Sequence, residues 1–138
     1  MVKPTDELTG TLVLVHPDLL IDPASKQGQI GMITGTDMQK DDFYVSFGRG
    51  EKALYSADAL MVLKPAETIY TTLMTHGIDT GYEDFKTLFQ INLLQQHGGP
   101  DSIKKAMGLA ISNDSLRNNS LHSLEDHLKQ QQSRGFER

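Results

Sequence analysis

Apolar residues in the first half of the chain come in short runs separated by polar turns, the pattern of an all-β module. The third run is the clearest, because every second residue in it is large and apolar: Phe43, Val45 and Phe47. A period of two places one face of a strand in a core and the other in solvent. Such runs predict five strands, over residues 11–16, 29–36, 42–47, 52–56 and 60–63.

The turns between these runs indicate that consecutive strands are antiparallel neighbours. Residues 37–42 are a polar turn, and Gly48 and Gly50 supply the glycines of a tight hairpin that can use positive φ. A five-strand meander of this size leaves the fewest unpaired edges when it curls into a barrel. We therefore expect residues 8–64 to form a five-stranded antiparallel barrel.

The order of these features resembles the SH3-like barrels and, among them, the KOW and tudor-like group. The resemblance lies in Val13 and Val15, in residues 28–33, in the strand before the glycine hairpin, and in the turn after Tyr55. Such barrels place a single 3₁₀ turn before the last strand, and residues 56–59 stand at that point. The resemblance covers less than half of the chain. Barrels of this type host nucleic-acid-binding, peptide-binding and structural roles, so it implies a fold more than a function.

After Pro65 the spacing of apolar residues changes from two to about 3.6, which predicts helices. The second of these helices is expected over about residues 82–96. Its apolar residues, including Phe89 and Leu93, cover a wide arc, which predicts a central and mostly buried helix. The chain is therefore expected to be α+β, an SH3-like barrel followed by a cluster of about four short helices. We expect residues 66–130 to form one helical region and residues 131–138 a frayed tail.

The last helical segment spaces Leu121, Leu124 and Leu128 over successive turns. A narrow leucine seam has two interpretations. It docks on the preceding helices of the same chain, or it pairs with a second copy of the chain, as the seams of coiled coils do. Self-association through these three leucines is the second interpretation.

Composition narrows the class of protein. The net charge is −5 and neither half is basic, whereas nucleic-acid binders usually carry a face rich in Lys and Arg. The chain has no cysteine, which excludes disulfides, thiolate metal sites and cysteine nucleophiles. We expect the N-terminal residues not to act as a signal peptide, and the apolar runs fall short of the roughly 20 residues that cross a bilayer. We expect a cytoplasmic protein with no membrane contact.

No residue pattern nominates an active site, a cofactor or a metal centre. His122 and His127 are five residues apart and face different sides of a helix, whereas a zinc-binding pair stands at i and i+4. Gly28, Gly31 and Gly35 lack the Lys-Ser/Thr of a phosphate loop. We interpret them as points where strands bend or backbones approach closely. We assign no catalytic residue, no metal ligand and no cofactor.

The first loop, residues 16–27, is the most distinctive segment of the expected barrel. It carries one cation, Lys26, where a loop that grips phosphates would carry more. It also carries three consecutive apolar residues: Leu19, Leu20 and Ile21. The loop either covers the barrel or contacts a protein partner.

Tyr44 and Tyr55 are the candidate surface aromatics of the barrel, which a tudor-type cage for a methylated cation would need. We expect a non-enzymatic protein-interaction or adaptor module, whose partner-binding residues are Leu19, Leu20, Ile21, Tyr44 and Tyr55. One alternative is a nucleic-acid- or ribosome-associated protein, which the KOW resemblance implies and the charge disfavours. Another is an enzyme whose site assembles between barrel and helices, near His76 or His97.

Overall fold

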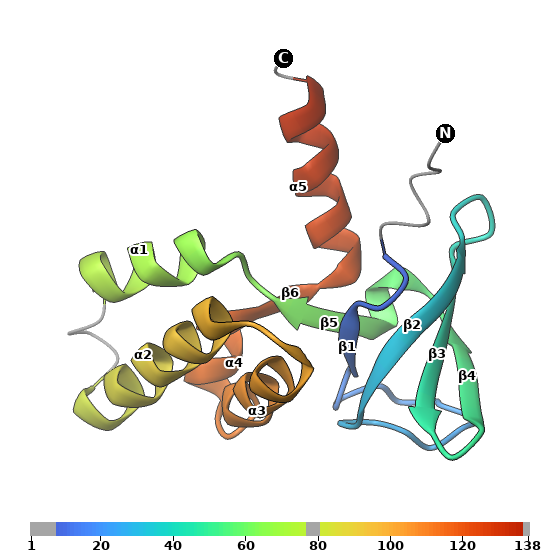
Figure 1. Cartoon of the computed structure of the whole chain (residues 1–138), viewed down its shortest axis with the longest axis horizontal. Helices are drawn as coiled ribbons and strands as arrows, with labels where there is room; N and C mark the ends of the chain where they lie inside the picture. Colours follow the sequence, from blue (N-terminus) through green and yellow to red (C-terminus); the bar gives the residue numbers. More distant parts are fainter. Residues whose placement is uncertain (1–7, 77–80, 137–138) are drawn as a thin grey trace. The chain divides into compact units, whose positions relative to one another are not determined.

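A computed structural model describes residues 8–76 and 81–136 of the chain (Figure 1). These residues form an α+β fold, which confirms the predicted class. The chain divides into two compact units. The sheet unit comprises Met1–Val62 and Ser123–Arg138, and the helical unit comprises Leu63–His122.

The described residues contain one curled sheet of six strands, in the order β4-β3-β2-β1-β5-β6. The strands are β1 (Leu12–Val15), β2 (Ile30–Asp37), β3 (Asp42–Gly48), β4 (Glu51–Tyr55), β5 (Leu60–Leu63) and β6 (Leu121–Ser123). The first five fall on the predicted runs, and the pairs β1–β2, β2–β3, β3–β4 and β1–β5 are antiparallel. The predicted count of five is wrong, because β6 adds a sixth strand. Three residues are too few to show a period of two, so β6 leaves no pattern in the sequence.

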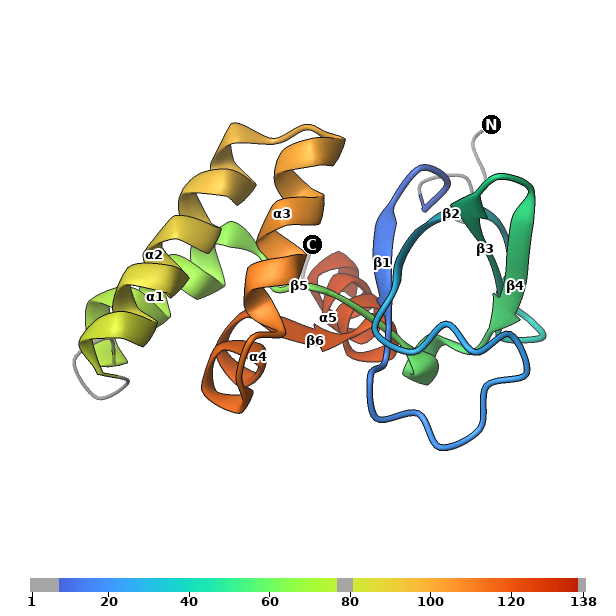
Figure 2. The same ribbon diagram turned by 90° about the horizontal axis from the view of Figure 1, so that it is seen from below.

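A glycine and a bulge allow the sheet to curl. A Cβ atom on Gly31 would lie 2.5 Å from Val45 Cγ1 and 2.8 Å from the carbonyl oxygen of Ser46, so glycine permits this close approach of β3 to β2. The register between β2 and β3 shifts between Ile33 and Gly35, and such bulges bend a strand and increase its twist. Figure 2 shows the resulting curl of β1 to β4. The expected role of glycine in close backbone approach is confirmed at Gly31.

The core of the sheet unit lies inside this curl. Its buried side chains are Leu8, Val13, Val15, Ile33, Phe43, Val45, Tyr55, Ala57, Ala59, Leu60, Val62 and Leu124. The two alanines come from the 3₁₀ turn η2 (Ala57–Ala59), which precedes β5 as expected. Leu124 comes from α5 (Leu124–Phe136), so a helix from the C-terminal end of the chain completes the core.

Four helices form most of the helical unit: α1 (Ala66–His76), α2 (Tyr82–His97), α3 (Pro100–Ala110) and α4 (Asp114–Ser120). The other three contact α2 (Figure 1). Two side-chain amides of α2 hold the segment that enters α1: Asn92 donates to the carbonyl of Ala66 at 3.1 Å, and Gln95 to that of Lys64 at 2.6 Å. The prediction that α2 is mostly buried is wrong, because Phe89 and Leu93 are about half exposed.

The last predicted helix differs most from the structure. The backbone of Leu121 is extended, with φ −121° and ψ 149°, so α4 ends there and β6 separates it from α5. The described residues therefore contain five α-helices rather than about four. The helix α5 belongs to the sheet unit and runs to Phe136. The sequence predicted instead that residues 66–130 form one helical region and that residues 131–138 form a frayed tail. Residues 137 and 138 of that tail lie outside the described residues.

Candidate functional site

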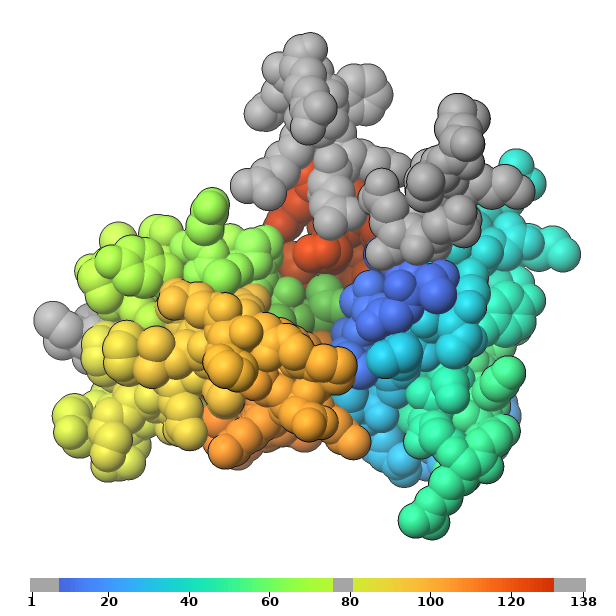
Figure 3. Space-filling model, in the orientation of Figure 1, coloured from blue at the N-terminus to red at the C-terminus, as the bar shows by residue number. Residues whose placement is uncertain are grey.

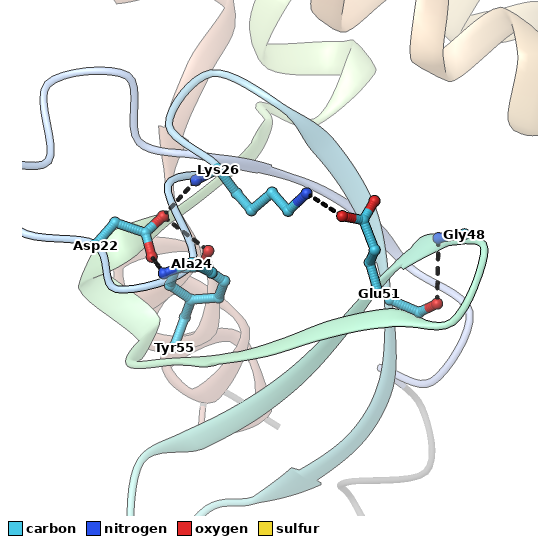
Figure 4. Close-up of polar contacts among 7 residues, drawn as sticks. Asp22, Ala24, Lys26, Gly48, Glu51 and Tyr55 are labelled. Carbon is cyan, nitrogen blue, oxygen red and sulfur yellow. Dashed lines mark hydrogen bonds and ion pairs between the residues drawn. The ribbon is translucent and has the colours of Figure 1, made fainter.

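The loop between β1 and β2 is anchored by the side chain of Asp22 (Figure 4). One carboxylate oxygen of Asp22 accepts from the backbone N–H of Ala24 at 2.9 Å. The other accepts from the backbone N–H of Lys26 and from the hydroxyl of Tyr55, both at 2.9 Å. Acceptance from the N–H two residues on is the Asx turn that aspartate favours. Because Tyr55 belongs to β4, the carboxylate both shapes the loop and fixes it to the sheet.

Lys26 provides a second attachment of the loop to the sheet. Its ammonium nitrogen lies 2.8 Å from a carboxylate oxygen of Glu51 on β4 (Figure 4). The same nitrogen lies 5.4 Å from the ring centroid of Phe47 on β3. The rings of Phe47 and Tyr55 pack edge to face with centroids 6.5 Å apart. The single cation of this loop is therefore occupied by a carboxylate and an aromatic ring.

The hydrogen bond between Asp22 and Tyr55 changes the pKa of both groups. Partial burial pulls the pKa of Asp22 upward, but hydrogen bonds from Lys26, Tyr55 and Ala24 outweigh it and hold this pKa below the ordinary 3.8. Burial raises the pKa of Tyr55 above its ordinary 10.0, and the hydrogen bond to the Asp22 carboxylate and its negative charge raise it further. At neutral pH a charged carboxylate thus accepts from a neutral phenol.

Leu20 and Ile21 project from the anchored loop into solvent. Their side chains are 95% and 83% exposed, respectively. Leu19, immediately before them, is half-buried and packs on the core of the sheet unit. Its N–H donates to the carbonyl of His16, and its carbonyl accepts from the side chain of Gln27, each at 3.2 Å. Of the three predicted apolar residues, Leu19 therefore attaches the loop to the sheet unit, whereas Leu20 and Ile21 are exposed to solvent.

Tyr44 and Tyr55, the other predicted partner-binding residues, lie on opposite faces of the sheet. Tyr55 is paired with Phe43, faces the core and is only 6% exposed. Tyr44 is paired with Leu54 on the outer face, where both are about half exposed. The two tyrosines cannot form the walls of one aromatic cage. Tyr55 acts instead as an anchor for the loop.

The leucines of the expected seam lie within the chain. Leu124 is fully buried in the core of the sheet unit, and Leu128 packs on the same core. Leu121 in β6 is 3% exposed. Leu124 and Leu128 thus pack within the chain, but on the core of the sheet unit rather than on the preceding helices as expected. Pairing of these leucines between two copies stays a prediction.

Sequence reasoning missed Asp22, Lys26 and Glu51 as the residues that hold the loop. A signal for the first was present, since Asp followed by Pro favours an Asx turn. The partnership of Lys26 with Glu51 left no signal, because it joins positions 25 residues apart. It depends on where the curl of the sheet brings β4.

Comparison of the chain with protein-family models, with curated proteins and with solved structures finds no match. Within residues 8–76 and 81–136, no group of three or more His, Cys, Asp or Glu side chains is placed to hold a metal ion. No helix in the same ranges combines the length and the apolar character needed to span a membrane.

The stabilisation that Asp22 provides is expected to depend on pH. The folded-state pKa of Asp22 is lowered, so its contribution is complete above about pH 5 and disappears as the pH falls through that lowered pKa. The folded-state pKa of Tyr55 is raised, so its contribution is present below pH 10.0 and is lost at higher pH. Asp22→Asn is expected to lower the free energy of unfolding by about 1 kcal/mol near neutral pH.

Urea unfolding of the wild type and Asp22→Asn checks this expectation at about pH 7 and about pH 3. The difference between the two proteins should shrink at the lower pH, because the lowered pKa makes the unfolded wild type take up a proton there more readily than the folded protein does. An equal difference at both pH values would contradict the role of the charged carboxylate. Tyr55→Phe serves as the matched variant, because it removes one donor and leaves the carboxylate in place.

Proposed function

We propose that this protein is a non-enzymatic interaction module that binds a protein partner through Leu20 and Ile21. The observation that carries this proposal is the display of two adjacent and almost fully exposed aliphatic side chains by a loop that is fixed on both sides. A single exposed apolar residue is ordinary on protein surfaces. A fixed loop, however, loses little conformational entropy on binding, so more of the energy of burying Leu20 and Ile21 goes into affinity.

The partner expected for this surface is a protein with an apolar pocket. Burial of two aliphatic side chains contributes about 1.5–3 kcal/mol each, enough for a central anchor when polar contacts surround it. The half-exposed Leu19 would extend the apolar contact toward the sheet. Tyr44, on the outer face of β3, would belong to a separate contact.

We also propose that the curled sheet is an SH3-like barrel of the KOW or tudor-like group and that the protein acts in the cytoplasm. The antiparallel order of β1 to β5 and the 3₁₀ turn before β5 support the barrel. The absence of cysteine supports a reducing compartment. The attachment of Lys26 to Glu51 weighs against the nucleic-acid function of such barrels, because this loop has no other Lys or Arg to meet a phosphate.

Capture from a nuclease-treated native lysate tests the proposed function. The full chain is immobilised as the wild type, as Leu20→Ser/Ile21→Ser, and as the control Leu54→Ser. Leu54 is a matched control because it is also aliphatic and exposed, at 49%, but lies on the outer face of β4. We expect a protein that the wild type and the control retain, and whose recovery falls at least about tenfold with the double variant.

Three results would contradict the proposal. In the first, the double variant retains the same proteins as the wild type. In the second, every specific protein disappears on nuclease treatment, which would favour the nucleic-acid- or ribosome-associated alternative. In the third, no protein is specifically retained. Thermal unfolding shows whether a variant fails to bind because it is unfolded or because it lacks the apolar surface. The free energy of unfolding should change by no more than about 0.5 kcal/mol at these exposed positions.

A further inference from the structure

The helical unit exposes its large apolar side chains on two of its helices. Within the described part of the unit, they are Tyr70, Met74, Tyr82, Phe89 and Leu93. The last three belong to α2 and are 73%, 46% and 50% exposed. Figure 3 shows α2, in yellow, at the surface of the unit. Its other side carries the buried residues that contact the neighbouring helices.

The exposed residues of α2 form a regular seam. Tyr82, Lys86, Phe89 and Leu93 are separated by four, three and four residues, so they lie on one side of the helix over three turns. This is the spacing of the inward-facing positions of a coiled coil. We call these four residues the α2 seam. A single lysine in such a seam restricts which helix can pair with it, and in which register.

We propose that the α2 seam pairs with the α2 seam of a second copy of this chain, antiparallel and about a two-fold axis. In that arrangement Tyr82 meets the partner's Leu93, and Lys86 meets the partner's Phe89. Each contact occurs twice, because a two-fold interface is self-complementary. The proposal does not rest on the function proposed for Leu20 and Ile21.

The charges along α2 favour a second copy of the chain as the partner, and they favour antiparallel pairing. Lys86 already lies 5.5 Å from the ring centroid of Tyr82, and pairing with the partner's Phe89 offers its ammonium a second aromatic face. Glu83 flanks one end of the seam and His97 the other. Antiparallel pairing sets the positive end of one helix dipole beside the negative end of its partner's dipole, whereas parallel pairing would set like ends together. Parallel pairing would set Lys86 against the partner's Lys86.

The size of the seam suits a weak dimer. Taking about 200 Å² for a fully exposed aromatic side chain, the exposed parts of Tyr82, Phe89 and Leu93 amount to roughly 300 Å² of apolar surface in each copy. With the polar residues along both edges, a pair would bury on the order of 1,000 Å², where specific interfaces begin. We expect a dissociation constant on the order of 10 μM.

Sedimentation velocity of the full chain over roughly 1–200 μM tests the proposal. The wild type should change from monomer to dimer across this range. Phe89→Glu should stay monomeric throughout, with dimerisation weakened at least about tenfold, and Leu54→Glu should dimerise like the wild type. An unchanged circular dichroism spectrum for Phe89→Glu shows that the variant is folded. A wild type that is monomeric throughout, or a dimer that Phe89→Glu leaves intact, would overturn the proposal.

Chemical cross-linking tests the direction of pairing, since the chain has no cysteine of its own. Gln90 lies near the centre of the seam and Gln96 beyond its end. In an antiparallel pair the two copies of residue 96 are roughly 25 Å apart along the axis, and those of residue 90 less than about 10 Å apart. A bifunctional maleimide that spans about 10 Å should therefore link Gln90→Cys and not Gln96→Cys. Linkage of both variants, or of Gln96→Cys alone, would overturn the antiparallel dimer.

Discussion

Gly31→Ala is expected to destabilise the sheet unit by on the order of 3 kcal/mol, the upper part of the range for overpacked cores. The added Cβ would stand 2.5 Å from Val45 Cγ1, 2.8 Å from the backbone oxygen of Ser46 and 3.0 Å from the ring of Phe47. A backbone oxygen cannot move aside as the end of a flexible side chain can, so β3 itself would have to shift. Thermal unfolding should show a melting temperature lower by roughly 10 °C or more.

Gly35→Ala is the matched control, since both glycines belong to β2 and neither has positive φ. A Cβ at Gly35 would lie 3.7 Å from Cδ2 of Tyr44, an ordinary van der Waals contact. Its effect should stay within about 1 kcal/mol. Equal effects of the two substitutions would mean that close approach is not what requires glycine at position 31.

Leu124→Ala is expected to cost about 2–5 kcal/mol, the range for a fully buried leucine. The side chain is 0% exposed and belongs to the core of the sheet unit, although residue 124 is far in sequence from the other members of that core. Hydrogen exchange locates the damage. Faster exchange at Val13 in β1 and Val45 in β3 would show that α5 supports the sheet.

Leu128→Ala provides the comparison on the same helix. Leu128 is half-buried against the same core, so its loss should cost about 1 kcal/mol, clearly less than that of Leu124. Both substitutions change helix propensity equally, because both replace Leu by Ala. If Leu124→Ala left exchange in β1 and β3 unchanged, the helix would not complete the core.

The sequence predicted β1 to β5 well because each of these strands has a local signature. Alternation at Phe43, Val45 and Phe47 and the glycines around Arg49 depend only on neighbouring residues, and the hairpin has positive φ at Gly48, Arg49 and Gly50. The five predicted strands differ from β1 to β5 by one residue or less at each end. Local chemistry was sufficient for this part of the fold.

The remaining features depend on partners that are distant in sequence. The strand β6 is formed by pairing with its neighbour β5, and α5 packs on the sheet through the buried side chain of Leu124. In α2, the count of apolar residues predicted burial, but it could not tell the side that packs from the side that carries Phe89 and Leu93. The candidate loop was recognised from Leu19 to Ile21, whereas its attachment through Lys26 and Glu51 required the folded sheet.

The sheet unit is assembled from two segments of chain with the whole helical unit inserted between them. During synthesis, β1 to β5 leave the ribosome well before Leu124, so the core of this unit is not complete until α5 has been made. The inserted helices have mostly local contacts and can fold first, since local contacts form quickly. Their folding would shorten the effective loop that must close when α5 joins the sheet. Among the described elements of the sheet unit, α5 is therefore the last to be secured.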